Sequence, residues 1–330
     1  MKQSPLYVVV PPRALLLDLA GPIEVVRRAN VEQTQVQFSI RHVGPRRTVM
    51  TSVGVSISGI DPLPRRLPAD AMVMVCGSLT ELSARRDPHA HRDRDDETAI
   101  IAWLHNRVGP ETIVITICSG ALLAARAGLL DGLACTTHYL CTAELAKAAP
   151  RAQVLEDRLY VEDRNRLTSA GITAGIDLML HVVARLIGDA HALAVARYMV
   201  IYLRRTGSEP QLSPWLDGRN HIHPAIHKVQ DAIAAAPQRE WPASALAKLA
   251  GTSTRHLSRL FVDHTGMTVP DYRNRLRVAL ARELLTHTQL DMERVAERSG
   301  FGSTRQLRRA WRTLFGTPPR AARIRRSDQA

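Results

Sequence analysis

The sequence predicts an α/β domain followed by an all-α domain. Over the first 200 residues, short apolar runs alternate with helical patterns, whereas beyond residue 221 every apolar pattern is helical. The length of 330 residues also exceeds what one hydrophobic core ordinarily serves. We therefore place a first domain at residues 1–203, a linker at 204–221 and a second domain at 222–330.

The apolar runs of the first domain are short, as expected for strands of a sheet that helices cover on both faces. These runs are Leu6–Val10, Val36–Val43, Ala71–Val75 and Thr112–Ile117. A helix is predicted over Gly21–Ala29. The charged stretch Ala84–Glu97 is predicted to be an exposed loop.

Positive charge is concentrated in the last third of the chain. Residues 221–330 contain 19 Lys and Arg residues against 9 Asp and Glu residues, a net charge of +10 out of +13 for the whole chain. Such a local excess suits a domain that binds a polyanion, because neutralised phosphates release their counterions. A solvated basic surface without a partner is the alternative.

The cysteines show neither a CxxC pair nor zinc-ligand spacing, so we expect a reduced cytoplasmic setting with no metal and no cofactor. They are Cys76, Cys118, Cys135 and Cys141. The apolar run near the N-terminus ends at Pro11-Pro12, too early for a signal sequence or a membrane span, and no later run is long enough. We expect a cytoplasmic protein that does not enter a membrane.

The second domain contains an internal repeat with a spacing of 50 residues. Ser253–Phe261 recurs as Ser303–Trp311, and Gly266 recurs as Gly316. Each copy follows a short amphipathic helix and a glycine-containing turn, which is the composition of a helix-turn-helix unit. The two serines are expected to cap the second helix of each unit, and Tyr272–Leu285 is predicted to be a long helix that joins the units.

In both copies the apolar spacing turns one helix face inward and leaves polar side chains outward. The residues predicted to pack inward are Leu257, Leu260, Phe261, Leu307, Ala310 and Trp311. Arginine can donate two hydrogen bonds to guanine, and arginine or serine can bind phosphate. The predicted DNA-binding residues are therefore Arg255, Ser258, Arg259, Thr304, Arg305, Arg308 and Arg309.

The segment His223–Arg323 resembles the DNA-binding domain of the AraC/XylS family. The resemblance includes Leu246-Ala247, Ser253-x-x-x-Leu257-x-Arg259-Leu260-Phe261, Arg275-Leu276-Arg277 and Gly300-Phe301-Gly302-Ser303. The sequence departs from the family at Leu307 and Trp311, where Phe is usual, and at Ala322, where Tyr is usual. The resemblance implies a homodimeric transcription regulator, more often an activator, that binds double-stranded promoter DNA in the nucleoid and contacts RNA polymerase.

Residues 1–200 resemble the PfpI-like, class I glutamine amidotransferase-like fold, which has a flavodoxin-like sheet. The matching segments are Asp18–Val25, Ile117–Ala121, Ala127–Gly132, Thr136–His138 and Leu167–Gly171. Together with the second domain, this is the layout of GlxA-like regulators.

Cys118 follows a predicted strand and precedes an Ala/Leu-rich helix. A sharp turn there is expected to expose the thiol near a helix N-terminus, where the dipole favours thiolate. Hydrolytic members of the fold usually carry histidine directly after this cysteine. Here Ser119 follows it, so the usual Cys-His dyad is absent, although the resemblance places Asp18 and His138 where they can approach the thiol.

Three interpretations of this site stay open. Asp18, Cys118, Ser119 and His138 could line the pocket of a small-molecule effector that modulates promoter binding. Alternatively, the chain is a cysteine-dependent hydrolase or hydratase with an accessory helical domain, in which these same residues, apart from Ser119, act as acid/base and nucleophile. A buried structural cysteine without a ligand is the third. We favour the non-enzymatic effector pocket, because an attached DNA-binding domain gives a pocket a use without chemistry.

Overall fold

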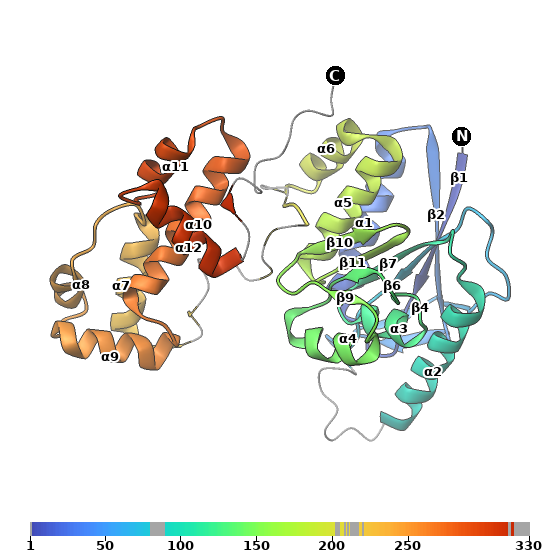
Figure 1. Ribbon diagram of the computed structural model, residues 1–330. Helices are drawn as coiled ribbons and strands as arrows, with labels where there is room; N and C mark the ends of the chain where they lie inside the picture. The colour runs from blue at the N-terminus through green and yellow to red at the C-terminus, as the bar shows by residue number, and fades with distance from the viewer. Residues whose placement is uncertain are drawn as a thin grey trace. The chain divides into compact units, whose positions relative to one another are not determined.

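The computed structural model describes residues 2–79, 90–201, 205–207, 209, 211, 218–219, 221–315 and 318–319. The chain divides into two compact units, Met1–Gln211 and Leu212–Ala330. The first is an α/β unit and the second is helical, which confirms the predicted fold class (Figure 1). No helix in the described part of the chain is both long and apolar enough to cross a membrane.

A seven-stranded sheet lies at the centre of the first unit, in the order β10-β11-β7-β6-β1-β2-β5. Every neighbouring pair is parallel except β10 and β11. The bounds are Lys2–Val9 for β1, Val36–Gly44 for β2, Asp61–Pro62 for β5, Met72–Val75 for β6, Ile113–Ile117 for β7, Tyr160–Asp163 for β10 and Arg166–Ser169 for β11. The four strands predicted from apolar runs correspond to β1, β2, β6 and β7.

Two small sheets flank this one. The antiparallel pair is β3 (Thr48–Met50) with β4 (Ser56–Ser58), and the parallel pair is β8 (Ala134–Cys135) with β9 (Gln153–Val154).

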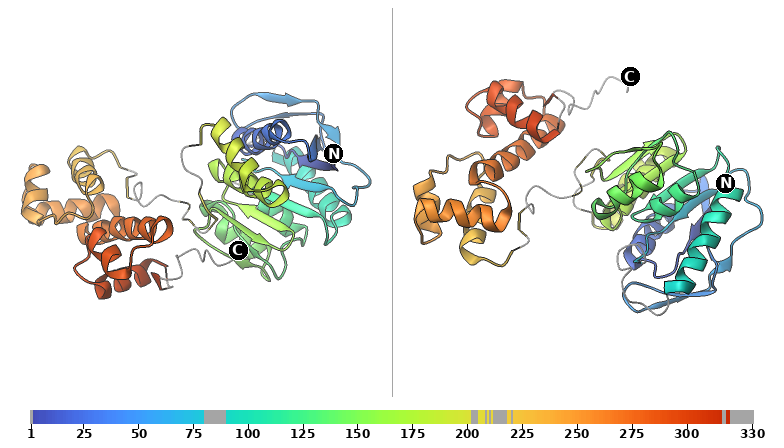
Figure 2. Two further views of the ribbon diagram at one scale, coloured as in Figure 1. Left: turned by 90° about the horizontal axis from the view of Figure 1, so that it is seen from above. Right: turned by 60° about the horizontal axis from the view of Figure 1, so that its bottom comes forward.

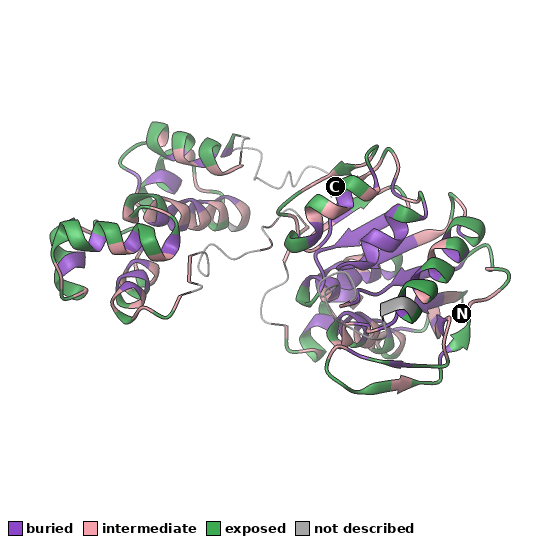
Figure 3. Cartoon of the chain, turned by 90° about the horizontal axis from the view of Figure 1, so that it is seen from below, coloured by how far each residue is buried: buried purple, intermediate pink, exposed green. Residues whose placement is uncertain are grey.

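Helices cover both faces of the main sheet (Figures 1 and 2). In β1, Leu6 and Val8 belong to one hydrophobic cluster, and Tyr7 and Val9 belong to another. This alternation follows from the period of two along a strand. The first cluster includes residues of α1 (Leu16–Glu32), α5 (Thr173–Ile187) and α6 (Asp189–Tyr198), and the second includes residues of α2 (Ala90–Arg107) and α3 (Gly120–Arg126). Figure 3 shows the buried residues gathered along the sheet.

Two local predictions in the first unit were wrong. The helix expected from Gly21 begins at Leu16, so it includes Asp18. The charged stretch expected to be a loop lies partly outside the described residues, but residues 90–97 form the first turns of α2. Asp93 in that helix is buried and forms an ion pair with Arg13, with Nε and Oδ2 2.7 Å apart. A paired carboxylate can be buried, and composition alone does not show the pairing.

The second unit has two hydrophobic cores joined by one helix. Its helices are α7 (Pro224–Ala235), α8 (Ala243–Leu249), α9 (Thr254–Thr265), α10 (Val269–His287), α11 (Met292–Arg298) and α12 (Thr304–Phe315). Tyr272 and Leu276 of α10 pack with α7, α8 and α9, whereas Val278 and Leu285 pack with α11 and α12. The predicted long linking helix is therefore present and takes part in both cores.

Candidate nucleic-acid interface and cysteine elbow

The two repeats of the sequence form two similar helix-turn-helix units, α8–α9 and α11–α12. The Ser253 hydroxyl accepts a hydrogen bond from the backbone N of His256, and the Ser303 hydroxyl accepts one from the backbone N of Gln306, both at 3.3 Å. Both serines thus act as the predicted N-caps. The turns contain Gly251 at φ +66° and Gly300 at φ +84°, a backbone region that suits glycine.

The inward faces of α9 and α12 are those predicted. The residues at the centre of each core are Leu257, Phe261, Leu307 and Trp311, all buried, while Leu260 and Ala310 are partly buried beside them. The two departures from the family pattern, Leu307 and Trp311, thus fill the second core. Ala322 and Gly316 lie outside the described residues.

The outward faces present the predicted DNA-binding side chains to solvent. Those exposed are Arg255, Ser258, Arg259, Arg305, Arg308 and Arg309, and Thr304 is half-buried. On α9, the Ser258 hydroxyl donates to the Thr254 carbonyl oxygen at 2.9 Å. The Arg259 guanidinium contacts Nδ1 of His256 at 3.2 Å.

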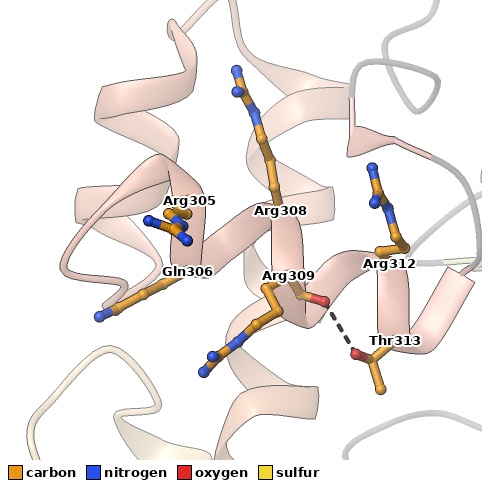
Figure 4. Close-up of a pocket in the computed structure, with 6 residues that line it drawn as sticks. All are labelled: Arg305, Gln306, Arg308, Arg309, Arg312 and Thr313. Atoms are coloured by element: carbon orange, nitrogen blue, oxygen red, sulfur yellow. Dashed lines mark hydrogen bonds between the residues drawn. The ribbon is translucent and has the colours of Figure 1, made fainter.

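An open hollow of about 590 Å³ lies on the exposed face of α12 (Figure 4). Its lining consists of Arg305, Gln306, Arg308, Arg309, Arg312 and Thr313. The sequence analysis missed Gln306, Arg312 and Thr313. The signal was available, because arginines at 305, 308, 309 and 312 have the spacing of one helix face. No carboxylate pairs with these four arginines among the residues that the structure describes, so their charges are free to bind an anion.

In the first unit, β7 ends in a sharp turn at Cys118, whose φ of +55° is unusual for a residue with a side chain. The turn matches the predicted elbow, but the predicted exposure of the thiol was wrong, because Cys118 is only 1% exposed. Gly77 and Gly171 pack against it: a Cβ added to Gly171 would lie 2.1 Å from Cys118 Cβ. Both glycines lie far from Cys118 in the sequence.

Asp18 of α1 faces this cysteine. Its carboxyl is fully buried; Oδ1 accepts a hydrogen bond from the backbone N of Ile172 at 2.6 Å, whereas Oδ2 has no hydrogen-bond partner among the described residues. Burial raises the pKa of Asp18 to about 6. Burial, together with the Asp18 charge, raises the pKa of the Cys118 thiol above its ordinary value. The thiolate expected from the helix dipole is therefore disfavoured, because desolvation outweighs the dipole.

Ser119 holds the elbow in place. Its hydroxyl donates to the carbonyl oxygen of Ser78 at 3.0 Å and accepts from the backbone N of Ser78 at 2.8 Å. This pair of bonds fixes the loop after β6 to the turn after β7. Since both functions of the hydroxyl are used, Ser119 supports the site rather than offering a free group.

His138 is half-buried and caps its own short turn, η1 (Tyr139–Cys141). Its Nδ1 accepts from the backbone N of Leu140 at 3.4 Å, and burial lowers its pKa. The structure thus brings Asp18 and Cys118 together, whereas His138 is connected to Cys118 only through the residue that precedes it. That neighbour, Thr137, was missed by the sequence analysis: its hydroxyl donates to the Cys118 carbonyl oxygen at 2.8 Å.

The comparisons with known proteins agree with this two-part layout. Residues 6–185 match the model of the DJ-1/PfpI family, which is more than half of the chain. The chain belongs to the DJ-1/PfpI family. Residues 246–325 match a helix-turn-helix domain model that spans α9 to α12. The DJ-1/PfpI member described here therefore carries an AraC-type helix-turn-helix domain, and both resemblances noted in the sequence are confirmed.

Two regulators match this chain over most of their own length. The HTH-type transcriptional regulator GbdR of Pseudomonas aeruginosa is 29% identical over 93% of this chain and 81% of its own. The HTH-type transcriptional regulator GlxA of Rhizobium meliloti is 29% identical over 94% of this chain and 92% of its own. An isonitrile hydratase of Pseudomonas putida is 28% identical over 54% of this chain. A crystal structure of a THiJ/PfpI family protein from Pseudomonas syringae shares the fold, with a TM-score of 0.50, 22% identity and coverage of 76% of this chain and 92% of that one.

Proposed function

We propose that this protein is a sequence-specific DNA-binding transcription regulator whose DJ-1/PfpI domain senses a small molecule. The observation that carries the proposal is the pair of exposed arginine faces on α9 and α12, each at the second helix of a helix-turn-helix unit. The relatives that match almost the whole chain are named as HTH-type transcriptional regulators, which supports the same function.

In this proposal α9 and α12 each enter a major groove of double-stranded DNA. Arg255 and Arg305, in the first turns of their helices, are placed to reach base edges, as the N-terminal residues of recognition helices do. Arg308, Arg309 and Arg312 supply phosphate contacts that fix the register. Because α10 belongs to both hydrophobic cores, it holds the two recognition helices at a constant spacing.

The proposal extends to partners. A homodimer would bind two copies of the operator site, and an activator of this kind would contact RNA polymerase on chromosomal DNA in the cytoplasm. Leu193 of α6 is an exposed apolar side chain and supplies a contact for the dimer. An effector can modulate promoter binding only if its affinity differs between the two states of the regulator.

An enzymatic role for the first domain is less well supported. The isonitrile hydratase matches 54% of the chain, whereas the two regulators match 93% and 94% of it. Ser119 follows Cys118, where the resemblance leads us to expect histidine in a hydrolase, and the Cys118 thiol is buried with a raised pKa. A nucleophilic cysteine needs a substantial thiolate fraction, so we propose that Asp18, Cys118 and His138 belong to an effector site without turnover.

The test is a titration of the full protein on the DNA upstream of its own gene and on a scrambled duplex, at several salt concentrations. We expect tighter binding to the upstream DNA and a steep loss of affinity with salt, since a tenfold rise in salt lowers the logarithm of the binding constant by roughly 0.9 for each neutralised phosphate. The double variant Arg308→Ala/Arg309→Ala should reduce the slope. Equal, weak binding to both duplexes, together with no bound fragment in a genome-wide selection, would overturn the proposal.

A further inference from the structure

Five described residues after α6 bind back onto the first unit. They are Arg205, Thr206, Gly207, Glu209 and Gln211, called the strap below. Beside β10, the backbone N of Leu159 donates to the carbonyl oxygens of Gly207 and Glu209, both at 3.1 Å. Although the strap lies within the predicted linker 204–221, it is thus part of the first compact unit, which ends at Gln211.

The first end of the strap is fixed to the start of α5. The Arg205 guanidinium donates to Asp177 Oδ2 at 2.9 Å and to the Thr173 hydroxyl at 2.8 Å. The Asp177 side chain is only 4% exposed, so this ion pair is shielded from water. Thr173 directly follows Ile172, whose backbone N is the partner of the buried Asp18 carboxyl. One anchor therefore lies one residue from the Asp18 contact.

The second end is fixed to the loop beside the elbow. The Gln211 side-chain amide donates to the Thr137 carbonyl oxygen at 2.8 Å, and its backbone N donates to Asp157 Oδ1 at 2.9 Å. The hydroxyl of the same Thr137 donates to the carbonyl oxygen of Cys118. The second anchor therefore reaches the elbow through a single residue.

We propose that the strap couples the Asp18–Cys118 site to the segment that leads to the DNA-binding unit. A ligand that displaces the loop at 171–173 or the loop at 136–138 removes an acceptor from the strap and weakens its hold. Release would add the strap to the chain between the two units, at up to about 3.5 Å per residue. A longer connection lowers the effective concentration of one DNA-binding unit beside another. Only this last consequence rests on the proposed function.

Coupling between two sites is reciprocal, so loss of the strap must loosen the cysteine site. The alkylation rate of Cys118 measures this loosening. Because the thiol is buried, it reacts with iodoacetamide only after a local opening. Alkylation would be followed in the full-length protein by mass spectrometry of each cysteine peptide. We expect Gln211→Ala and Arg205→Ala each to raise the Cys118 rate roughly tenfold, the factor that corresponds to losing about 1.4 kcal/mol.

Two controls separate coupling from general loss of stability. Cys76, buried in the same core, should keep its wild-type rate in both variants. Arg151→Ala removes an exposed ion pair with Asp131 instead, and should leave the Cys118 rate unchanged. If Gln211→Ala does not fold, Arg205→Ala carries the test alone, with Arg205→Lys as its conservative counterpart.

The proposal is overturned if Cys118 reacts at the wild-type rate in the strap variants, or if Cys76 accelerates to the same extent. The labelling requires no DNA. A chain that fails to bind its promoter can therefore still show the coupling, and a true DNA-binding regulator can lack it.

Discussion

Gly171 crosses directly over Cys118, with no space between them for a further atom. A Cβ at position 171 would lie 2.1 Å from Cys118 Cβ and 2.8 Å from its Sγ, and the φ of Gly171 is +85°. Because this residue has no side chain, the loop before α5 can pass the elbow and bring the backbone N of Ile172 to Asp18. The absence of a side chain at Gly171 therefore allows Asp18 and Cys118 to lie together.

Gly171→Ala should lower the free energy of unfolding by about 3 kcal/mol. Roughly 1 kcal/mol comes from the positive φ, and about 2 kcal/mol comes from the overpacking against Cys118. Urea denaturation would measure the loss. The matched control is Gly132→Ala, whose φ is +71° but whose Cβ would meet nothing within 4 Å; it should cost only about 1 kcal/mol. Equal losses in the two variants would show that the contact with Cys118 does not matter.

The Asp18 carboxyl should make stability depend on pH. Its pKa of about 6 lies above the ordinary value of 3.8, so the folded state binds the proton more tightly. The stabilisation from the protonated carboxyl is full below pH about 4 and is lost as pH rises through about 6. This shift in pKa corresponds to a change of about 3 kcal/mol in the free energy of unfolding across that pH range.

Asp18→Asn carries no such proton, so between pH 4 and pH 7 the variant should gain stability relative to the wild type. Denaturant unfolding at several pH values would measure this. Asp131→Asn, at a partly exposed carboxyl that pairs with Arg151, serves as the control and should follow the wild-type curve. Parallel curves for Asp18→Asn and the wild type would contradict the raised pKa.

Much of the fold followed from local patterns. The apolar runs predicted four strands of the main sheet, and the 50-residue repeat predicted both helix-turn-helix units with their serine caps. These features depend on residues a few positions apart. Their periodicity is therefore visible in the sequence itself.

The features that the sequence did not predict depend on contacts between distant residues. The burial of Cys118 requires Gly77 and Gly171, which only the folded sheet brings beside it. The burial of Asp93 in the first turns of α2 goes with its ion pair to Arg13, 80 positions apart. The strap has no periodicity, because its bonds run from Arg205 and Gln211 to single acceptors on other loops.

Arg255→Ala and Arg305→Ala should each weaken binding to the correct operator by about 1–3 kcal/mol, since a bidentate contact to guanine has that value. The scrambled duplex should be affected far less. Fluorescence anisotropy on both duplexes would measure the difference. Arg294→Ala is the matched control: this arginine of α11 pairs with Glu297 and does not line the hollow on α12. If the correct operator and the scrambled duplex lose the same affinity, these arginines bind only phosphate.

Four histidines of the second unit pack against one another and should make that unit sensitive to acid. The ring centroids of His221 and His227 lie 4.4 Å apart, those of His223 and His264 lie 4.6 Å apart, and those of His221 and His264 lie 5.6 Å apart. Burial lowers the pKa of His221, and the neighbouring His227 lowers it further. A lowered pKa stabilises the fold above pH about 6.5, and this contribution is lost as pH falls through the folded value.

His227→Gln should therefore raise the pKa of His221 toward its ordinary value and reduce the loss of stability in acid. NMR titration of the imidazole C–H signals would report the pKa, and thermal unfolding between pH 5 and pH 8 would report the stability. His256→Gln, an exposed histidine of α9 outside the cluster, should change neither. Because His264 lies on α9, the acid effect should also reach DNA binding by the first helix-turn-helix unit. If His221 titrates identically in the wild type and in His227→Gln, the rings do not interact in solution.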